Sequence, residues 1–267
     1  MLKDITIGQY FPVESPVHRL DGRTKLILTF AYIVFLFLAK GVAAYGLFAL
    51  SLVAVIKISH ISFKMVAKSL KPIAFLAVFT ALLNMLYTPG QVLWRFWIFQ
   101  ITQEGIVLAA FMVARIVMLI AATSLLTYTT SPVALTDSIE TLFRPLNRLH
   151  VPVHEFAMMM TIALRFIPTL IEETEKIINA QKARGADFET GNIIRRAKAL
   201  IPVLVPLFVS AFRRADELSV AMECRLYRGG AGRTRLKQLK MGKNDAAAFA
   251  ICCVFFAAVM VVTKVWP

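Results

Sequence analysis

The chain has 267 residues, of which 58 % are hydrophobic, and its mean hydropathy is +0.68. Soluble domains contain roughly 45–50 % apolar residues, so this composition excludes an ordinary soluble protein and indicates an integral membrane protein. The net charge is +14. Because the basic residues lie in segments between apolar runs, they indicate the lysine and arginine bias of cytoplasmic loops, and not a nucleic-acid-binding protein.

Five apolar runs predict membrane-spanning helices. Each is near the ~20 residues that a bilayer requires, although the first is short. A polar and aromatic loop from Pro89 to Glu104 separates the third from the fourth. The predicted spans cover residues 25–39, 42–58, 72–88, 105–129 and 245–263.

The distribution of lysine and arginine orients these spans. The amino-terminal segment, the loop after the second span and the stretch 131–243 are all basic, and this stretch holds 18 Lys and Arg against 11 Asp and Glu. The two opposite loops carry only Lys40 and Arg95. We therefore expect a multi-pass protein whose amino terminus and long basic region are cytoplasmic and whose carboxyl terminus is outside.

The stretch 131–243 is too polar for a series of spans and too apolar for a loop, and Ser131-Pro132 marks the start of its first helix. The expected fold is an all-α membrane protein with about five transmembrane helices and a cytoplasmic region of two or three long amphipathic helices. Its predicted domains are an amino-terminal membrane domain at 1–130 with four spans, the cytoplasmic helical domain at 131–243, and the last transmembrane helix at 244–267.

Two long helices are predicted within the cytoplasmic region. Apolar residues recur at helical spacing from about 153 to 184, and Gly185 is well placed to terminate that helix. The second helix is expected from about 192 to 227. Because proline lacks the backbone N–H, Pro202 and Pro206 are expected to bend or interrupt it.

Each long helix ends in an arginine between two small or apolar residues. The two tripeptides are Ala183, Arg184 and Gly185, and Cys224, Arg225 and Leu226. These arginines could be ordinary cytoplasmic charges. That explanation does not account for the same placement at two helix ends, 41 residues apart. Because a guanidinium pairs with a carboxylate in a fork geometry, we favour docking onto an acidic pocket of a soluble partner.

No motif in the sequence indicates catalysis, and we expect no catalytic, cofactor-binding or metal-binding residue in this chain. The charge deepest within a span is Arg115. Such a residue usually faces the protein interior or a polar cavity. Two interpretations are equally favoured: a relay or partner contact, or a structural pairing with a helix carbonyl, Asn84 or Glu104.

Over almost its whole length the chain resembles the transmembrane (T) component of energy-coupling factor transporters, the EcfT or CbiQ family. The resemblance rests on the apolar spans, the basic helical region with two arginine motifs, and the last span. Ala183-Arg184-Gly185 matches the family's Ala-Arg-Gly motif in full. At the second position the chain reads Cys224-Arg225-Leu226, which keeps only the arginine.

The resemblance implies a non-catalytic subunit of an ATP-driven importer of vitamins or other micronutrients in a prokaryotic cell membrane. Each motif arginine would dock into one of two cassette ATPases (EcfA- and EcfA′-like), which would hold ATP and magnesium. A substrate-binding S component would sit on the apolar face of the long helices, beside membrane lipid. The alternatives are a conventional permease, which should carry several polar residues at mid-membrane, and an intramembrane enzyme, which needs paired carboxylates or a similar cluster.

Overall fold

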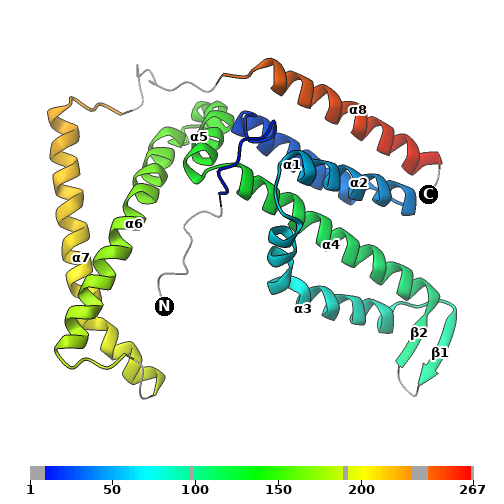
Figure 1. The fold of residues 1–267 in the computed structure, drawn as a ribbon, viewed down its shortest axis with the longest axis horizontal. Helices are drawn as coiled ribbons and strands as arrows, with labels where there is room; N and C mark the ends of the chain where they lie inside the picture. The colour runs from blue at the N-terminus through cyan, green and yellow to red at the C-terminus, as the bar shows by residue number, and fades with distance from the viewer. Residues whose placement is uncertain (1–9, 97–98, 189–191, 230–239, 266–267) are drawn as a thin grey trace. The chain divides into compact units, whose positions relative to one another are not determined.

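The computed structural model describes residues 10–96, 99–188, 192–229 and 240–265 (Figure 1). They form two compact units, each described here by itself. The bundle unit comprises residues 10–138 and 240–265, and the helix-pair unit comprises residues 139–229 within the described ranges.

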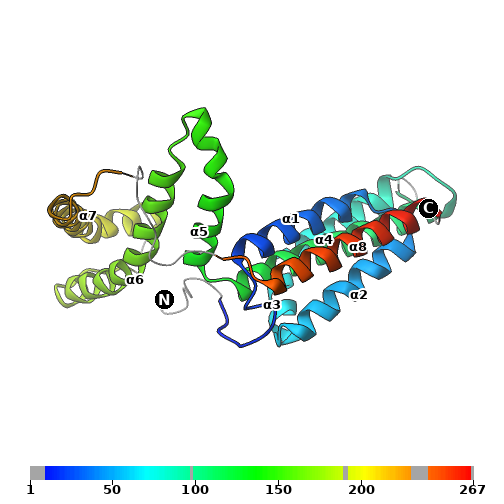
Figure 2. The same ribbon diagram turned by 90° about the horizontal axis from the view of Figure 1, so that it is seen from above.

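The bundle unit contains six helices in whole or part and one short hairpin among its described residues. Helices α1, α2, α4 and α8 lie side by side (Figure 2), and α3 packs on α4. The elements are α1 (Gly22–Leu38), α2 (Val42–Ile58), α3 (Phe63–Tyr87), β1 (Val92–Phe96), β2 (Phe99–Thr102), α4 (Gln103–Thr129), the first half of α5 (Pro132–Phe143) and α8 (Lys243–Val265). This confirms the predicted all-α class.

Two boundaries differ from the sequence prediction. Helix α3 begins at Phe63 rather than at residue 72, because the Ser62 hydroxyl caps it by accepting the Lys64 N–H. The segment Pro89–Glu104, predicted as a loop, instead contains the antiparallel pair β1 and β2. The alternation of apolar and polar residues in β2 is typical of strands.

Four helices of the described chain are long and apolar enough to cross a membrane: α3, α4, α6 (Val153–Ala183) and α8. Helix α2 is a shorter apolar helix, and α1 also has only 17 residues. Helices α3, α4 and α8 contain three of the predicted spans. The predicted cytoplasmic location of α6 is not tested by its length and composition, and charged residues in its second half, such as Glu172, favour that prediction.

The buried core of the bundle unit is small. One cluster joins α1, α2, α4 and α8 around Phe48 and Val259, both 0 % exposed, and a second joins α2, α3 and α4 around Ala121. Most large apolar side chains of α3 are instead exposed, including Phe75, 81 % exposed. In water this would be unfavourable, so these faces suit contact with lipid.

Three helix ends meet in a buried polar cluster at one end of the bundle unit. The Lys25 ammonium donates to the Thr129 carbonyl at 2.8 Å, at the carboxyl end of α4. The Asp245 carboxylate accepts the Asp21 N–H at 2.9 Å and the Gly242 N–H at 2.8 Å. Carboxylates therefore lie at the amino ends of α1 and α8, and an ammonium at the carboxyl end of α4, as helix dipoles favour.

The helix-pair unit contains two long helices. After the second half of α5 and a short 3₁₀ helix, η1 (Arg144–Leu149), come α6 (Val153–Ala183) and α7 (Ile193–Cys224). These confirm the predicted long helices to within a few residues. Helix α7 continues through Pro202 and Pro206, so the expected interruption does not occur, and Figure 1 shows instead that the amino-terminal part of α7 bends away from the rest of the helix.

Candidate functional site

The first arginine motif forms a Schellman motif at the carboxyl end of α6. Arg184 is the C-cap residue, and Gly185 after it has a left-handed φ of +88°. The Gly185 N–H donates to the Lys182 carbonyl at 2.9 Å, and the Ala186 N–H donates to the Gln181 carbonyl at 3.0 Å. These are the two reversed hydrogen bonds that define this type of helix end. The predicted termination by Gly185 is confirmed.

The second motif ends α7 in the same geometry. Arg225 takes the C-cap position, and Leu226 after it has a φ of +55°. The Leu226 N–H donates to the Glu223 carbonyl at 2.9 Å, and the Tyr227 N–H donates to the Met222 carbonyl at 3.0 Å. Arg184 and Arg225 therefore occupy equivalent positions, although the residues around them differ.

The six motif residues are all exposed. A Cβ built at Gly185 would meet nothing within 4 Å, so its φ, and not crowding within this chain, is what favours glycine there. Among the described residues, neither Arg184 nor Arg225 forms a side-chain hydrogen bond or ion pair. Both guanidinium groups can therefore meet an acidic partner without first breaking a contact within this chain. The exposed residues are Ala183, Arg184, Gly185, Cys224, Arg225 and Leu226.

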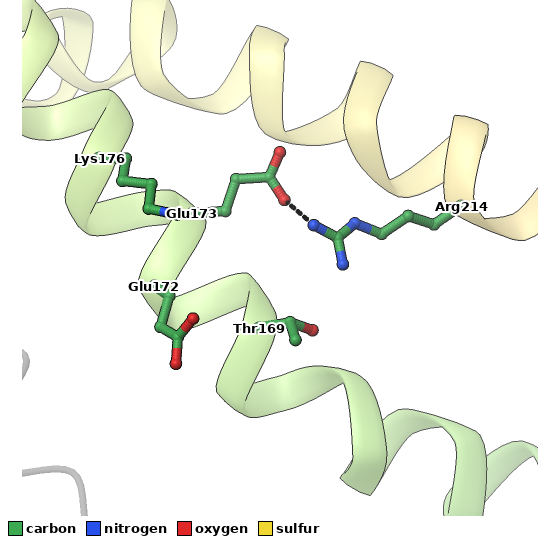
Figure 3. A pocket seen from close by; sticks show the side chains of 5 residues that line it. All are labelled: Thr169, Glu172, Glu173, Lys176 and Arg214. Atoms are coloured by element: carbon green, nitrogen blue, oxygen red, sulfur yellow. Dashed lines mark hydrogen bonds and ion pairs between the residues drawn. The ribbon is translucent and has the colours of Figure 1, made fainter.

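Helices α6 and α7 pack in opposite directions (Figure 1). The Arg214 guanidinium of α7 donates to the Glu173 carboxylate of α6 at 2.7 Å. Near the end of α6, the Gln181 amide lies 3.5 Å from the Pro202 carbonyl. Figure 3 shows the ion pair across an open pocket of about 240 Å³ that Thr169, Glu172, Glu173, Lys176 and Arg214 line.

This antiparallel packing separates the two motifs. The contact between Gln181 and Pro202 places the Arg184 end beside the first third of α7. From Pro202 to Arg225 the helix rises by about 35 Å at 1.5 Å per residue. The two arginines therefore lie at opposite ends of the helix pair, which sequence periodicity did not show.

A large apolar stripe on α7 has no partner within the described chain. It recurs at helical spacing and consists of Ile201, Leu204, Val205, Phe208 and Phe212, between 48 % and 69 % exposed. Arg214 lies on the opposite side of the helix, which faces α6. Exposed apolar surface of this extent marks a protein or membrane contact.

A second pocket of about 530 Å³ lies between α6 and the carboxyl half of α7. Met222 and Tyr227 both line it. These residues are the pair whose apolar contact often accompanies a Schellman motif. The pocket therefore adjoins the second arginine motif, and no signal in the sequence indicated it.

Arg115 of α4 is held by aromatic residues and not by the partners proposed for it. Its Nε donates to the Tyr45 hydroxyl at 2.8 Å, and its guanidinium carbon lies 5.2 Å from the centre of the Phe37 ring. Asn84 instead donates to the Thr80 carbonyl, and Glu104 accepts the Gln91 N–H. The structural pairing with Asn84 or Glu104 is therefore wrong, because both side chains form other hydrogen bonds, near where α3 ends and α4 begins.

The chain matches a known protein family over most of its length. The family model for CbiQ, described as cobalt transport protein, matches residues 13–236.

Individual relatives are similar over 94–100 % of their own length. The chain is 53 % identical over 266 residues to the energy-coupling factor transporter transmembrane protein EcfT of Ruminiclostridium cellulolyticum, covering 100 % of both chains. It is 54 % identical over 248 residues to the protein of the same name from Thermosediminibacter oceani, covering 93 % of this chain and 94 % of the relative. The EcfT of Bacillus subtilis is 46 % identical over 258 residues, 96 % and 97 % of the two chains.

Proposed function

The chain belongs to the EcfT/CbiQ family and is the T component of an energy-coupling factor transporter, and from this premise we propose how it couples ATP hydrolysis to transport. It is a non-catalytic subunit that transmits movement between partners. ATP and magnesium are held by two cassette ATPases, and the imported vitamin or other micronutrient is held by an S component. No cofactor binds to the T component itself.

The observation that carries this proposal is the matched pair of helix ends. Arg184 and Arg225 occupy the same C-cap position, are both exposed, and have no partner among the described residues. The rise of about 35 Å along α7 from Pro202, beside the Arg184 end, to Arg225 approaches the diameter of a domain of 100–200 residues. Such a spacing suits one arginine for each of two ATPase subunits, with each guanidinium paired to a carboxylate in an acidic groove.

The exposed apolar stripe on α7 supports the proposed binding of the second kind of partner, the S component. Ile201, Phe208 and Phe212 lie on the face turned away from Arg214 and α6. An S component is itself a membrane protein, so an apolar face is the contact it can bury. Movement of the ATPases at the two helix ends would tilt this face and the S component on it.

The polar cluster supports the proposed orientation. Lys25, Asp21 and Asp245 bring the starts of α1 and α8 to the end of α4, on one side of the bundle unit. Arg23 and Lys25 lie at this end, so under the positive-inside rule we assign it to the cytoplasmic side. The T component then has a cytoplasmic amino terminus and cytoplasmic α6 and α7 in the cell membrane.

The test is the double variant Arg184→Ala with Arg225→Ala, co-expressed with the two partner cassette ATPases and purified in mild detergent, and the measurement is how much ATPase co-purifies. We expect the ATPases to be lost from the T component, because removing one partner of an interfacial charged contact costs about 2–5 kcal/mol. The matched control is Arg213→Ala, an exposed arginine within α7 that should retain both ATPases. Full ATPase retention and transport by the double variant would refute the docking role.

A further inference from the structure

Helices α1 and α2 form a hairpin that is shorter than the helices around it. Each has 17 residues and a length of about 25 Å, against 27 residues in α4. The hydrocarbon core of a bilayer is ~30 Å thick. Lys25 fixes one end of α1 in the polar cluster, so α1 fails to reach the membrane boundary at its other end. Lys40 lies at that end, in the turn between α1 and α2.

Arg115 lies beside this short end. It is 14 residues before Thr129, so its Cα is about 21 Å from the polar cluster along α4. Its contacts with Phe37, near the end of α1, and with Tyr45, in the early part of α2, place its guanidinium at the level of the turn. The remaining distance to the far membrane boundary is on the order of 10 Å.

The guanidinium has unused hydrogen-bonding capacity. Of its five N–H donors, only Nε–H has a hydrogen-bond partner within the described ranges, the Tyr45 hydroxyl. The closest carboxylate on the same helix, Glu104, lies eleven residues away, about 16 Å, and accepts the Gln91 N–H. Arg115 is half-buried, while Lys40 and Phe37 are exposed. A guanidinium at this depth requires an anion or other acceptors.

We propose that the short α1–α2 hairpin forms a binding notch for the phosphate of a membrane phospholipid, held by Arg115 and Lys40. The membrane thins locally to meet the short helices, which brings a headgroup down to the guanidinium. Tyr45 fixes the guanidinium through Nε, and the other four N–H groups face the phosphate oxygens. Phe37 and Tyr45 supply the aromatic surroundings typical of a membrane interface.

The test is native mass spectrometry of the full purified chain, titrated with phosphatidylglycerol in detergent. We expect Arg115→Gln to weaken retention of the tightest-bound lipid about tenfold, since a charge-assisted hydrogen-bond site is lost. Lys40→Gln, in an exposed turn where the substitution leaves the fold intact, should weaken it by a smaller factor of about three.

The matched control is Lys264→Gln, an exposed lysine in the last turn of α8 at the same end of the bundle unit. It should retain phosphatidylglycerol as the unchanged chain does. Unchanged retention in both Arg115→Gln and Lys40→Gln would overturn the proposal. An equal loss in Lys264→Gln would also overturn it, because any surface cation would then bind the lipid as well. Should Arg115→Gln fail to fold, Lys40→Gln and its control still decide the outcome.

Discussion

Gly185 and Leu226 occupy the same position, one residue after the C-cap arginine, and both have left-handed backbone, with φ of +88° and +55°. Glycine adopts this conformation without steric cost, whereas a residue with a Cβ loses roughly 1–2 kcal/mol. The two helix ends that hold Arg184 and Arg225 are therefore alike in geometry and different in strain.

Replacing Leu226 by glycine should stabilise the protein. Relief of the left-handed strain is expected to contribute about 1 kcal/mol, partly offset by the greater freedom of the unfolded chain. The measurement is thermal unfolding of the purified chain in detergent, where the midpoint should rise. Leu200→Gly, at an exposed leucine inside α7, should lower it because glycine disfavours a helix interior. A lower midpoint for Leu226→Gly would show that its side chain contributes more than its strain costs.

A lysine at position 184 should bind the ATPases less well than the native arginine. Arg184→Lys keeps the positive charge but loses the planar fork that pairs with both oxygens of a carboxylate. We expect ATPase retention intermediate between the unchanged chain and Arg184→Ala, reduced about tenfold if one charge-assisted hydrogen bond is lost. The measurement is the affinity of the purified ATPase pair for each immobilised form of the T component: the unchanged chain, Arg184→Lys and Arg184→Ala. Equal binding by the lysine variant would indicate that charge alone is recognised.

The ion pair between Glu173 and Arg214 should contribute little to stability. Its side chains are 22 % and 36 % exposed, so solvent screens the attraction. A double-mutant cycle with Glu173→Ala and Arg214→Ala is expected to give a coupling energy of about 0.5–1 kcal/mol in unfolding. A value several times larger would mean that the pair governs how α6 and α7 pack.

Lys25→Met should destabilise the bundle unit far more. The buried ammonium donates to the His18 and Thr129 carbonyls at 3.1 and 2.8 Å. Its loss leaves an unmet carbonyl at the end of α4 beside buried carboxylates, at a cost of about 3–5 kcal/mol. The measurement is the free energy of unfolding from denaturant titration of Lys25→Met. The control is Lys57→Met, at the exposed end of α2, which should change that free energy by less than about 0.5 kcal/mol.

Several features were predictable because they depend on local chemistry. Apolar runs fix where helices can cross a membrane, so α2 was predicted at its observed bounds, residues 42–58. Gly185 marked the end of α6 because glycine is favoured in left-handed backbone. The start of α3 was missed because Lys64 and Lys68 lower the hydropathy of its first two turns, and hydropathy does not register the cap at Ser62.

The sequence by itself determined the all-α class, the two arginine-bearing helix ends and the likeness to the EcfT family, since each follows from residue order along one segment. Only the tertiary structure decided that Arg115 binds Tyr45, that Lys25 closes the end of α4, and that the arginine motifs lie at opposite ends of an antiparallel pair. These relationships join residues 70, 104 and 21 positions apart. Periodicity describes one helix at a time, whereas the packing of side chains between helices selects which faces and which ends meet.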